Sequence, residues 1–245
     1  MRFVVPYHLD EYRPELDVPL TPDAVISPDL PDTTDPWARM AVLYNAVADR
    51  VADSVRRGER PIVASGDCTT SIGIVTGLQR AGLDPALVWF DAHGDVQTLE
   101  TSASGYLGGM PIRMLTGYGR HLLADGLGLR DIPEERTVLV DGRDLDPPEA
   151  EYLKTSRIAQ RRVDDLDELP SGPLYLHLDC DVIDPADLPG LLFPVPEGPS
   201  LPTVARALHG VLATGRVAAV GLACTWRDDH GCGERLRPII DSLAA

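Results

Sequence analysis

Residues 88–95 read Val-Trp-Phe-Asp-Ala-His-Gly-Asp, an apolar run that ends in two carboxylates with a histidine between them. Residues 174–181 repeat this pattern, since Leu-Tyr-Leu-His-Leu leads directly into Asp-Cys-Asp. A short apolar run bounded by polar residues is typical of a strand buried on both faces of a parallel sheet. Because the carboxyl ends of parallel strands meet at one edge, we expect the acids of both runs to lie together.

Apolar runs and helical periods alternate along the chain. Strands are predicted at 2–7, 61–64, 87–90, 137–140, 174–178 and 217–222, and helices at 37–57, 69–78, 147–154 and 202–212. A loop rich in Pro, Asp and Thr is predicted at 14–36. The alternation predicts an α/β fold with a central, mostly parallel sheet flanked by helices. With 245 residues, 44% of them hydrophobic, a single domain over 1–245 is the economical prediction.

The charge of the chain restricts its partners. A net charge of -16 and a pI near 4.6 argue against nucleic acid or an anionic membrane surface, whereas a cationic small molecule is compatible. The acidity is equally compatible with solubility or a salt-adapted host. The 4 cysteines form no CxxC pair, which favours a reducing compartment. The first ten residues lack a signal-peptide stretch and no run has membrane-spanning length, so we expect a cytoplasmic protein.

The converging acids themselves predict a metal centre. Ionisable groups at the ends of buried strands repel one another unless cations compensate them. Oxygen ligands with one imidazole suit a divalent ion such as Mn(II), and two ions sharing carboxylates suit activation of a water molecule. One such string alone is better explained as a helix cap or a turn, but two of them, each behind an apolar strand, favour metal ligation.

The two strings and a third, Ser-Gly-Asp-Cys-Thr at 65–69, resemble the metal motifs of the ureohydrolase superfamily, which includes arginases and agmatinases. The stretch Asp-Gly-Arg-Asp-Leu-Asp-Pro-Pro-Glu at 141–149 is similar to the family's loop near the amino-acid end of the substrate. The resemblance spans 60–225. It implies a three-layer, arginase-like fold and a metal-dependent hydrolase of linear amidines with a small-molecule substrate. A homo-oligomer is compatible with it.

The resemblance also implies a centre of two Mn(II) ions. Its ligands would be Cys68, Asp91, His93, Asp95, Asp179 and Asp181. Asp91 and Asp179 would bridge the ions, Cys68 and Asp95 would complete one site, and the remaining pair would complete the other. Asp95 or Asp181 is the expected proton acceptor in catalysis.

Three further residues near these motifs have no ligand role in this interpretation. Asp67 and Asp184 are expected to orient ligands or to form turns. His177 lies two residues before a bridging aspartate, deeper along the strand, and is expected to be structural.

Cys68 is the first departure from the family pattern, because most members have histidine there. A thiolate is softer than imidazole and adds negative charge, so the metal preference of the site is expected to differ. Two alternatives remain open: Cys68 is a small buried residue in a one-metal site, or it is itself a nucleophile, for which no neighbouring base is evident.

The second departure follows Ser104, where the chain reads Ser-Gly-Tyr-Leu-Gly-Gly-Met-Pro. Arginases typically read Ser-Gly-Asn-Leu-His-Gly, and the histidine acts as proton shuttle. Here Gly108 takes its place, which is expected to open room above the metals. Gln97, Ser104 and Tyr106 fall where the family contacts the substrate α-carboxylate, and Asp146 falls where it meets the α-amino group.

Both departures resemble a narrower branch, the Nω-hydroxy-L-arginine amidinohydrolase of D-cycloserine biosynthesis. That branch implies hydrolysis of Nω-hydroxy-L-arginine to hydroxyurea and ornithine. The alternatives are hydrolysis of another guanidino or ureido compound, an agmatinase-like activity on unmodified guanidines, and a degenerate member that binds metal or ligand without turnover.

A third departure concerns the glutamate that usually grips the guanidinium after the last strand. The chain has Cys224-Thr225-Trp226 there, and Asp228 or Asp229 would have to reach in from the next loop. Trp226 is expected either to stack on a planar substrate group or to lie in the core or on the surface.

Overall fold

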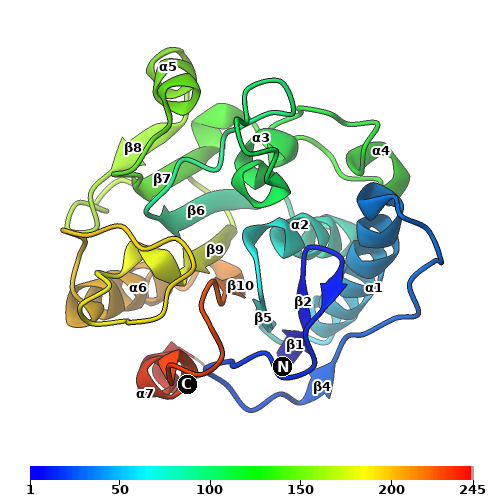
Figure 1. Cartoon of the computed structure of the whole chain (residues 1–245), viewed down its shortest axis with the longest axis horizontal. Helices are drawn as coiled ribbons and strands as arrows, with labels where there is room; N and C mark the ends of the chain where they lie inside the picture. The colour runs from blue at the N-terminus through cyan, green and yellow to red at the C-terminus, as the bar shows by residue number, and fades with distance from the viewer. Residues whose placement is uncertain (244–245) are drawn as a thin grey trace.

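The computed structural model describes residues 1–243 and is built on an eight-stranded sheet, with the order β4-β1-β5-β10-β9-β6-β7-β8 (Figure 1). In this order the strands are β4 (Ala24–Val25), β1 (Arg2–Val5), β5 (Ile62–Ser65), β10 (Val217–Ala223), β9 (Leu174–Asp179), β6 (Ala86–Asp91), β7 (Thr137–Asp141) and β8 (Ala159–Arg161). Each neighbouring pair in this sheet is parallel. The prediction of a mostly parallel central sheet is confirmed.

Helices cover both faces of the sheet (Figure 1). One face packs against α1 (Pro36–Arg56), α2 (Ser71–Arg80), α3 (Pro111–Leu115) and α4 (Ala124–Leu127), and the other against α6 (Leu201–Ala213) and α7 (Cys232–Leu243). α5 (Pro147–Thr155) follows β7. Short 3₁₀ turns are η1 (Cys68–Thr70), η2 (Leu107–Gly109), η3 (Glu134–Arg136) and η4 (Cys180–Val182). The three-layer arrangement expected from the sequence is therefore confirmed.

The core is divided by the sheet because successive side chains of a strand point to opposite faces. Trp89 of β6 packs in the cluster under α1 and α2, whereas its neighbour Phe90 packs in the cluster under α6. Both rings are 0% exposed. Strands with two buried faces explain why the sequence shows continuous apolar runs here rather than alternation.

The strand predicted at 2–7 is interrupted in the structure. β1 ends at Val5, and the chain continues as a separate antiparallel hairpin of β2 (Tyr7–His8) and β3 (Glu11–Tyr12). Pro6 lies between β1 and β2, and proline has no N–H to donate to the ladder. Its carbonyl accepts instead from Arg13 N at 2.7 Å, which closes the hairpin. As a result, His8 is carried towards the carboxyl edge of the sheet.

The sequence pattern also missed β4, β8, α7 and the short helices α3 and α4. The loop predicted at 14–36 contains β4, which pairs with β1 in parallel register. The segment after residue 231 forms α7, although it includes Pro238. A two-residue strand and a charged helix with an internal proline are too weakly patterned to be distinguished from loop.

The strand order places a topological switch at the centre of the sheet. The chain leaves β5 through α2 and re-enters at β6, and the later strands β9 and β10 fill the gap between them. Ligand sites of open α/β sheets lie at the carboxyl ends of strands at such a switch. β5, β10, β9 and β6 are adjacent there, so the loops after them can share one site.

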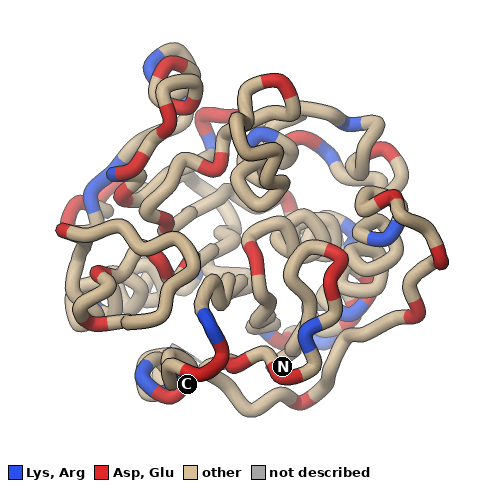
Figure 2. Tube along the Cα trace, viewed as in Figure 1, with Lys and Arg blue, Asp and Glu red and all other residues tan. Residues whose placement is uncertain are grey.

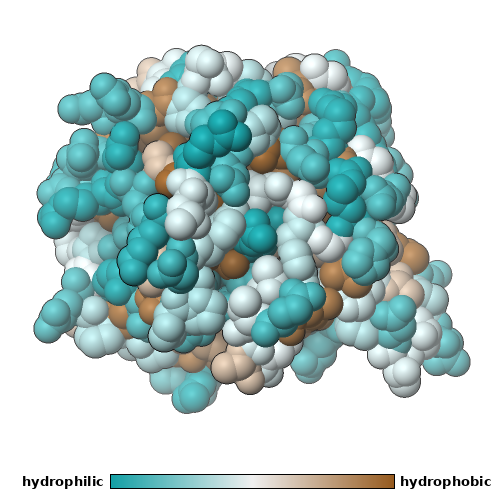
Figure 3. All heavy atoms as spheres, turned by 90° about the horizontal axis from the view of Figure 1, so that it is seen from above, coloured by the Kyte–Doolittle hydropathy of each residue, from teal (hydrophilic) through white to brown (hydrophobic). Residues whose placement is uncertain are grey.

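The surface is acidic without a single acidic block. Asp and Glu are distributed over most of the trace, with Lys and Arg interspersed (Figure 2). The face in Figure 3 is mainly hydrophilic with small apolar patches. Within residues 1–243, no helix combines the length and hydrophobicity that crossing a membrane requires.

Candidate metal centre

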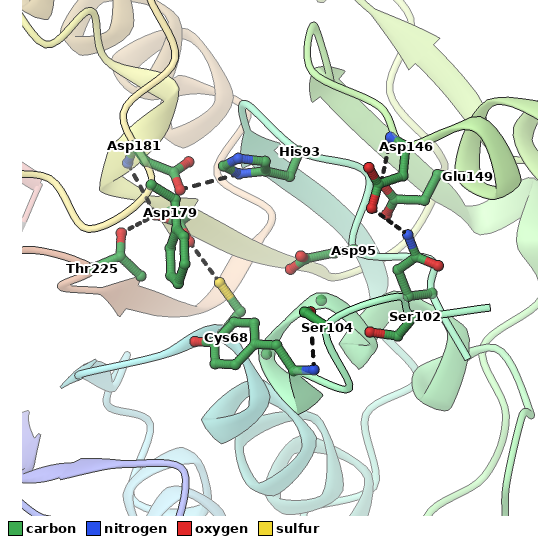
Figure 4. Close-up of a pocket in the computed structure, with 15 residues that line it drawn as sticks. Cys68, His93, Asp95, Ser102, Ser104, Asp146, Glu149, Asp179, Asp181 and Thr225 are labelled. Atoms are coloured by element: carbon green, nitrogen blue, oxygen red, sulfur yellow. Dashed lines mark hydrogen bonds and ion pairs between the residues drawn. The ribbon is translucent and has the colours of Figure 1, made fainter. Parts of the chain in front are cut away.

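A pocket of about 340 Å³ opens at the switch point (Figure 4). Its lining residues are Cys68, His93, Asp95, Gln97, Ser102, Ser104, Tyr106, Gly108, Gly109, Asp146, Glu149, Asp179, Asp181, Phe193 and Thr225. Every ligand expected from the sequence except Asp91 lines it, and Asp91 is 1% exposed beside them. The figure shows Asp95 between the group around Cys68 and Asp179 and the pair Asp146 and Glu149. The pocket therefore has a ligand-rich end and a second polar end.

The loop after β6 places an acid and a histidine beside the loop after β9. Asp91 ends β6, and its carboxylate accepts from Trp89 Nε1 at 3.1 Å and from His93 N at 2.7 Å. His93 Nδ1 lies 3.4 Å from Asp91 Oδ1 and 3.2 Å from Asp181 Oδ2. The ligand atoms of Asp91, His93 and Asp181 all lie within 4.8 Å of one another. This distance matches the spread of ligands around one ion.

Asp95 is held in an unusual backbone conformation. Its φ is 53°, in the left-handed region that non-glycine residues seldom adopt. The residue is 4% exposed, and Oδ2 has no hydrogen-bond partner among the described residues. Burial, together with the charges of Asp91 and Asp179, raises the pKa of Asp95. A buried carboxylate oxygen without a donor is suited to a cation or a proton.

Cys68 and Asp179 meet across the strand ends. Cys68 opens η1 directly after β5, and its Sγ donates to Asp179 Oδ2 at 2.8 Å. The other oxygen of Asp179 accepts from Thr225 Oγ1 at 2.5 Å and from Asp181 N at 3.0 Å. Burial, and next the charge of Asp179, raises the pKa of the Cys68 thiol. A thiolate and a carboxylate this close need a shared cation, which is what a metal ion supplies.

Asp67 and Asp184 hold backbone rather than line the pocket. Asp67 accepts from Thr69 N at 2.7 Å and from Leu9 N at 2.6 Å, which caps η1 and anchors the N-terminal hairpin. Asp184 accepts from Ala186 N at 2.8 Å and Gly198 N at 2.9 Å. These contacts agree with the turn-forming role expected for both residues.

Taken together, the donors fit two divalent ions. Acids from two strand ends converge with a histidine and a thiol. Each of these side chains except His93 is at most 4% exposed. Asp91 belongs to both groups of residues whose ligand atoms lie within 4.8 Å, one with His93 and Asp181 and one with Cys68 and His177. A carboxylate shared between two groups is the arrangement that a bridged pair of ions requires.

Without metal, the protein is expected to lose stability as the pH rises from about 5 to about 8. Burial and neighbouring acids raise the pKa of Asp95 and Asp179, and raise that of Asp181 to about 6. An acid with a raised folded pKa binds more protons when folded, so the unfolding free energy falls as the pH rises through this window.

His93 acts in the same direction. Burial lowers the pKa of His93, but hydrogen bonds to Asp181 and Asp91 outweigh it and raise the pKa to about 12. The stabilisation from this histidine is therefore complete below its pKa in the unfolded chain and declines as the pH rises above that value. Mn²⁺ should reverse the trend because it binds deprotonated ligands. Thermal unfolding of chelated and Mn-loaded protein across this range tests both points. A metal-free Tm that stays level or rises with pH would contradict the electrostatics.

The second polar end of the pocket is a preassembled hydrogen-bonded group. Gln97 Nε2 donates to Asp146 Oδ2 at 2.9 Å, and Asp146 N donates to Glu149 Oε2 at 3.1 Å in the capping box of α5. Burial raises the pKa of Glu149 to about 6. Ser104 Oγ accepts from Tyr106 N at 3.2 Å. The structure thus brings Gln97, Ser104, Tyr106 and Asp146 into one pocket, and their contact with a substrate stays a prediction.

The room expected beside Gly108 is filled. A Cβ on Gly108 would lie 2.3 Å from ring carbons of Tyr106, so the tyrosine ring occupies the space that a side chain at 108 would take. The expectation of an opened pocket was wrong at this point, because sequence does not show which way Tyr106 turns. Glycine at 108 and tyrosine at 106 are instead complementary.

His8 of β2 holds the Tyr106 ring in place. The two rings stack with centroids 5.8 Å apart, and Tyr106 OH lies 3.1 Å from His8 Nε2. His8 Nδ1 lies 2.9 Å from the carbonyl of Gly66, which can only accept, so Nδ1 carries the proton. In a neutral ring Nε2 then accepts from the tyrosine. No sequence pattern marks His8, because the hairpin that positions it was not predicted.

Trp226 and the two aspartates after it do not reach the pocket. Trp226 is 1% exposed, packs in the core under α6, and donates from Nε1 to Asp17 O at 3.1 Å. Trp226 therefore lies in the core, and the prediction that its ring stacks on a planar substrate group was wrong. Asp228 is paired with Arg13 at 2.8 Å, and Asp229 with His230 at 3.3 Å.

Several lining residues were not expected from the sequence. Thr225 orients Asp179, and Phe193 lies edge-on to His93 with centroids 6.2 Å apart. Glu149 could have been found, since Asp146-Pro-Pro-Glu149 has the spacing of a capping box. No signal marks Phe193, which comes from the long loop between η4 and α6.

Known proteins share this architecture. Residues 7–224 match the sequence profile of the arginase family. An arginase of Bacillus subtilis (strain 168) is 32% identical over 167 residues, which are 62% of this chain and 56% of the relative. The Nω-hydroxy-L-arginine amidinohydrolase of Streptomyces lavendulae is 29% identical over 194 residues, 77% of this chain and 68% of the relative. A crystal structure of arginase from Bacillus subtilis superposes with a TM-score of 0.82 at 23% identity, covering 100% of this chain and 97% of the other. The matched segment thus spans little more than half of the first of these curated relatives.

Proposed function

Because this chain belongs to the arginase family, we propose that it hydrolyses a C–N bond of a guanidine-type small molecule, and that its substrate is Nω-hydroxy-L-arginine. The products are hydroxyurea and ornithine. Members of the family are metal-dependent hydrolases that act on guanidino compounds. The choice of substrate is supported by two departures from the arginase pattern that lie in one pocket. Cys68 donates a hydrogen bond to Asp179, and the Tyr106 ring packs over Gly108.

Two Mn(II) ions are the proposed cofactor. The ligand set is Cys68, Asp91, His93, Asp95, Asp179 and Asp181. When bound, the ions would act as Lewis acids that activate water and stabilise negative charge developing at the reacting carbon. The protein's part is to hold this geometry: Trp89 and Thr225 donate to the two proposed bridging carboxylates and limit their rotation.

Asp95 and Asp181 are the proposed proton carriers. Both line the pocket, so each can face a bound substrate. A carboxylate beside the reacting water can accept its proton and return it to the leaving amine. Asp95 Oδ2 has no partner among residues 1–243, so a proton held there displaces no existing bond.

The pocket charge favours a substrate with a cationic amino group at the end formed by Asp146 and Glu149. Asp146 and Glu149 lie at one end, Asp179 and Asp181 at the other, and no Lys or Arg of the described chain lines the space between. A substrate α-amino group would pair with Asp146, which Gln97 already orients. The amidine carbon would then lie over the ligand-rich end.

A hydroxyguanidine suits this pocket better than a guanidine. Its amidine group is less basic, so collapse of the tetrahedral intermediate depends less on a dedicated proton donor, and the shuttle position is Gly108. A fully charged guanidinium would also gain less binding energy here than in a pocket with a clamping glutamate. Asp228, which could have replaced that glutamate, is paired with Arg13.

The test is ornithine release from Nω-hydroxy-L-arginine and from L-arginine by the Mn-loaded protein, at equal concentrations. We expect kcat/KM to favour the hydroxylated substrate by at least about 10²-fold, the lower range of a general-acid contribution. Chelated protein is the control. Equal rates on both substrates would refute the proposed specificity.

A second candidate function is hydrolysis of another guanidino or ureido compound. It is favoured because neither candidate for a guanidinium clamp lines the pocket: Asp228 is paired with Arg13, and the side chain of Asp229 is 86% exposed. It predicts no ornithine release from either arginine substrate but turnover of a neutral ureido analogue. A degenerate, non-catalytic member predicts metal binding with turnover of none of them.

A further inference from the structure

His177 is a buried side chain with an unpaired nitrogen next to the proposed metal centre. The residue is 1% exposed, and its Nδ1 lies 3.0 Å from Ser71 Oγ and 3.3 Å from Tyr175 OH. Nε2 has no hydrogen-bond partner among the described residues. Leaving a buried polar atom unpaired costs about 1–3 kcal/mol, so the position of this ring calls for a physical reason.

The ring is fixed by its neighbours rather than free to turn. His177 on β9 is paired in register with Trp89 on β6, and the two rings stack with centroids 3.7 Å apart. Trp89 in turn donates to Asp91. Because residues two apart on a strand share a face, His177 lies directly below Asp179, and Trp89 directly below Asp91. The imidazole therefore forms the floor of the carboxylate cluster.

The chemical state of the ring suits a ligand. Nδ1 has two hydroxyl groups within hydrogen-bond distance, whereas Nε2 has no partner among the described residues, and a neutral imidazole coordinates metals through such a free nitrogen. Ser71 Oγ can accept as well as donate. When Nδ1 carries the proton and donates to Ser71, Nε2 keeps its lone pair free.

The distances place His177 with two residues already in the proposed centre. Ligand atoms of Cys68, Asp91 and His177 all lie within 4.8 Å of one another, and all three residues are buried. Sulfur, an imidazole nitrogen and one carboxylate oxygen would together be a donor set typical of zinc. The other group, Asp91 with His93 and Asp181, is richer in oxygen and suits manganese.

We propose that His177 is a metal ligand, and that Cys68, Asp91 and His177 form a site selective for a borderline ion such as Zn²⁺ or Co²⁺ over Mn²⁺. Asp91 links this site to the group containing His93 and Asp181. The proposal rests on the two-ion centre of the proposed function, but it replaces the Mn(II) proposed there at one of the two positions by a borderline ion.

The experiment measures Co²⁺ and Mn²⁺ binding to metal-free protein, in the wild type and in His177→Gln, with folding checked by circular dichroism. Co²⁺ reports directly, because a thiolate ligand produces a sulfur-to-cobalt charge-transfer band that Cys68→Ser removes. We expect His177→Gln to weaken Co²⁺ binding by at least about 10-fold and to change its ligand-field spectrum, with a smaller effect on Mn²⁺. Tyr175→Phe is the matched control, since it removes a hydroxyl from the same buried network but no proposed ligand.

An unchanged Co²⁺ affinity and spectrum in folded His177→Gln would overturn the proposal. If that variant does not fold, X-ray absorption of His93→Asn carrying one equivalent of Zn²⁺ decides the matter. Sulfur together with imidazole scattering supports His177, because His93 is then absent, and sulfur without imidazole refutes it. Neither measurement uses a substrate, so failure of the hydrolase proposal and failure of this one remain distinguishable.

Discussion

Replacing Asp179 by asparagine is expected to reduce the bound ions from two to at most one per chain and to lower hydrolysis by at least about 10³-fold. Asp179 contacts three groups of the centre: its oxygens accept from Cys68, Thr225 and the backbone of Asp181. An amide of the same shape retains an acceptor for the backbone but cannot bridge two cations. Metal analysis by mass spectrometry and an ornithine assay measure both effects.

The same substitution should not destabilise the metal-free protein. Burial, and then the charges of Asp181 and Asp91, raises the pKa of Asp179, so its ionised form is unfavourable in the folded state. Removing that charge should leave the Tm equal or higher at neutral pH, which separates a metal defect from misfolding. Asp53→Asn, on the exposed side of α1, is the matched control. Two ions per chain and activity within about 10-fold of the wild type in Asp179→Asn would exclude a bridging role.

Replacing the loop residues Tyr106 and Gly108 together, by asparagine and histidine, is expected to shift the substrate preference towards L-arginine. Gly108→His alone should not produce L-arginine hydrolysis, because its Cβ would collide with the Tyr106 ring. His8 holds that ring by stacking and a hydrogen bond. Forcing a side chain into filled space costs about 1–3 kcal/mol or displaces the ring. Tyr106→Asn with Gly108→His removes the collision and restores a proton donor. We expect the double variant to hydrolyse L-arginine about 10²-fold faster than either single variant.

This prediction has a control in the same loop. Gly109→Ala meets its nearest neighbour, Gln97, at 3.7 Å, an ordinary contact, and should be tolerated where Gly108→Ala is not. Thermal unfolding and kcat/KM for both arginine substrates, measured for the wild type, the two single variants and the double variant, complete a double-mutant cycle. Additive effects of the two substitutions on L-arginine hydrolysis would show that Tyr106 and position 108 do not compete for space.

The fold was predictable because its signals are local. The apolar runs before Asp91 and Asp179 mark strands buried on both faces, and helical periods between such runs leave few arrangements other than a parallel sheet covered by helices. The elements that were missed are short or weakly patterned. β4 has only Ala24–Val25 to mark it, and Pro6 divides a run that looked continuous.

For the site, the sequence alone determined which residues arrive at the carboxyl edge. Strand ends and their loops place Cys68, Asp91 and Asp179 there whatever the side chains do, because parallel strands share one direction. The tertiary structure decided what the side chains do next: Tyr106 turns over Gly108, Trp226 enters the core, and His177 reaches the centre from below. Each of these depends on the direction of a side chain and on partners far along the chain, such as His8 for Tyr106 and Asp17 for Trp226. Periodicity carries no information on such contacts, since they are set by packing among elements that meet only in the folded protein.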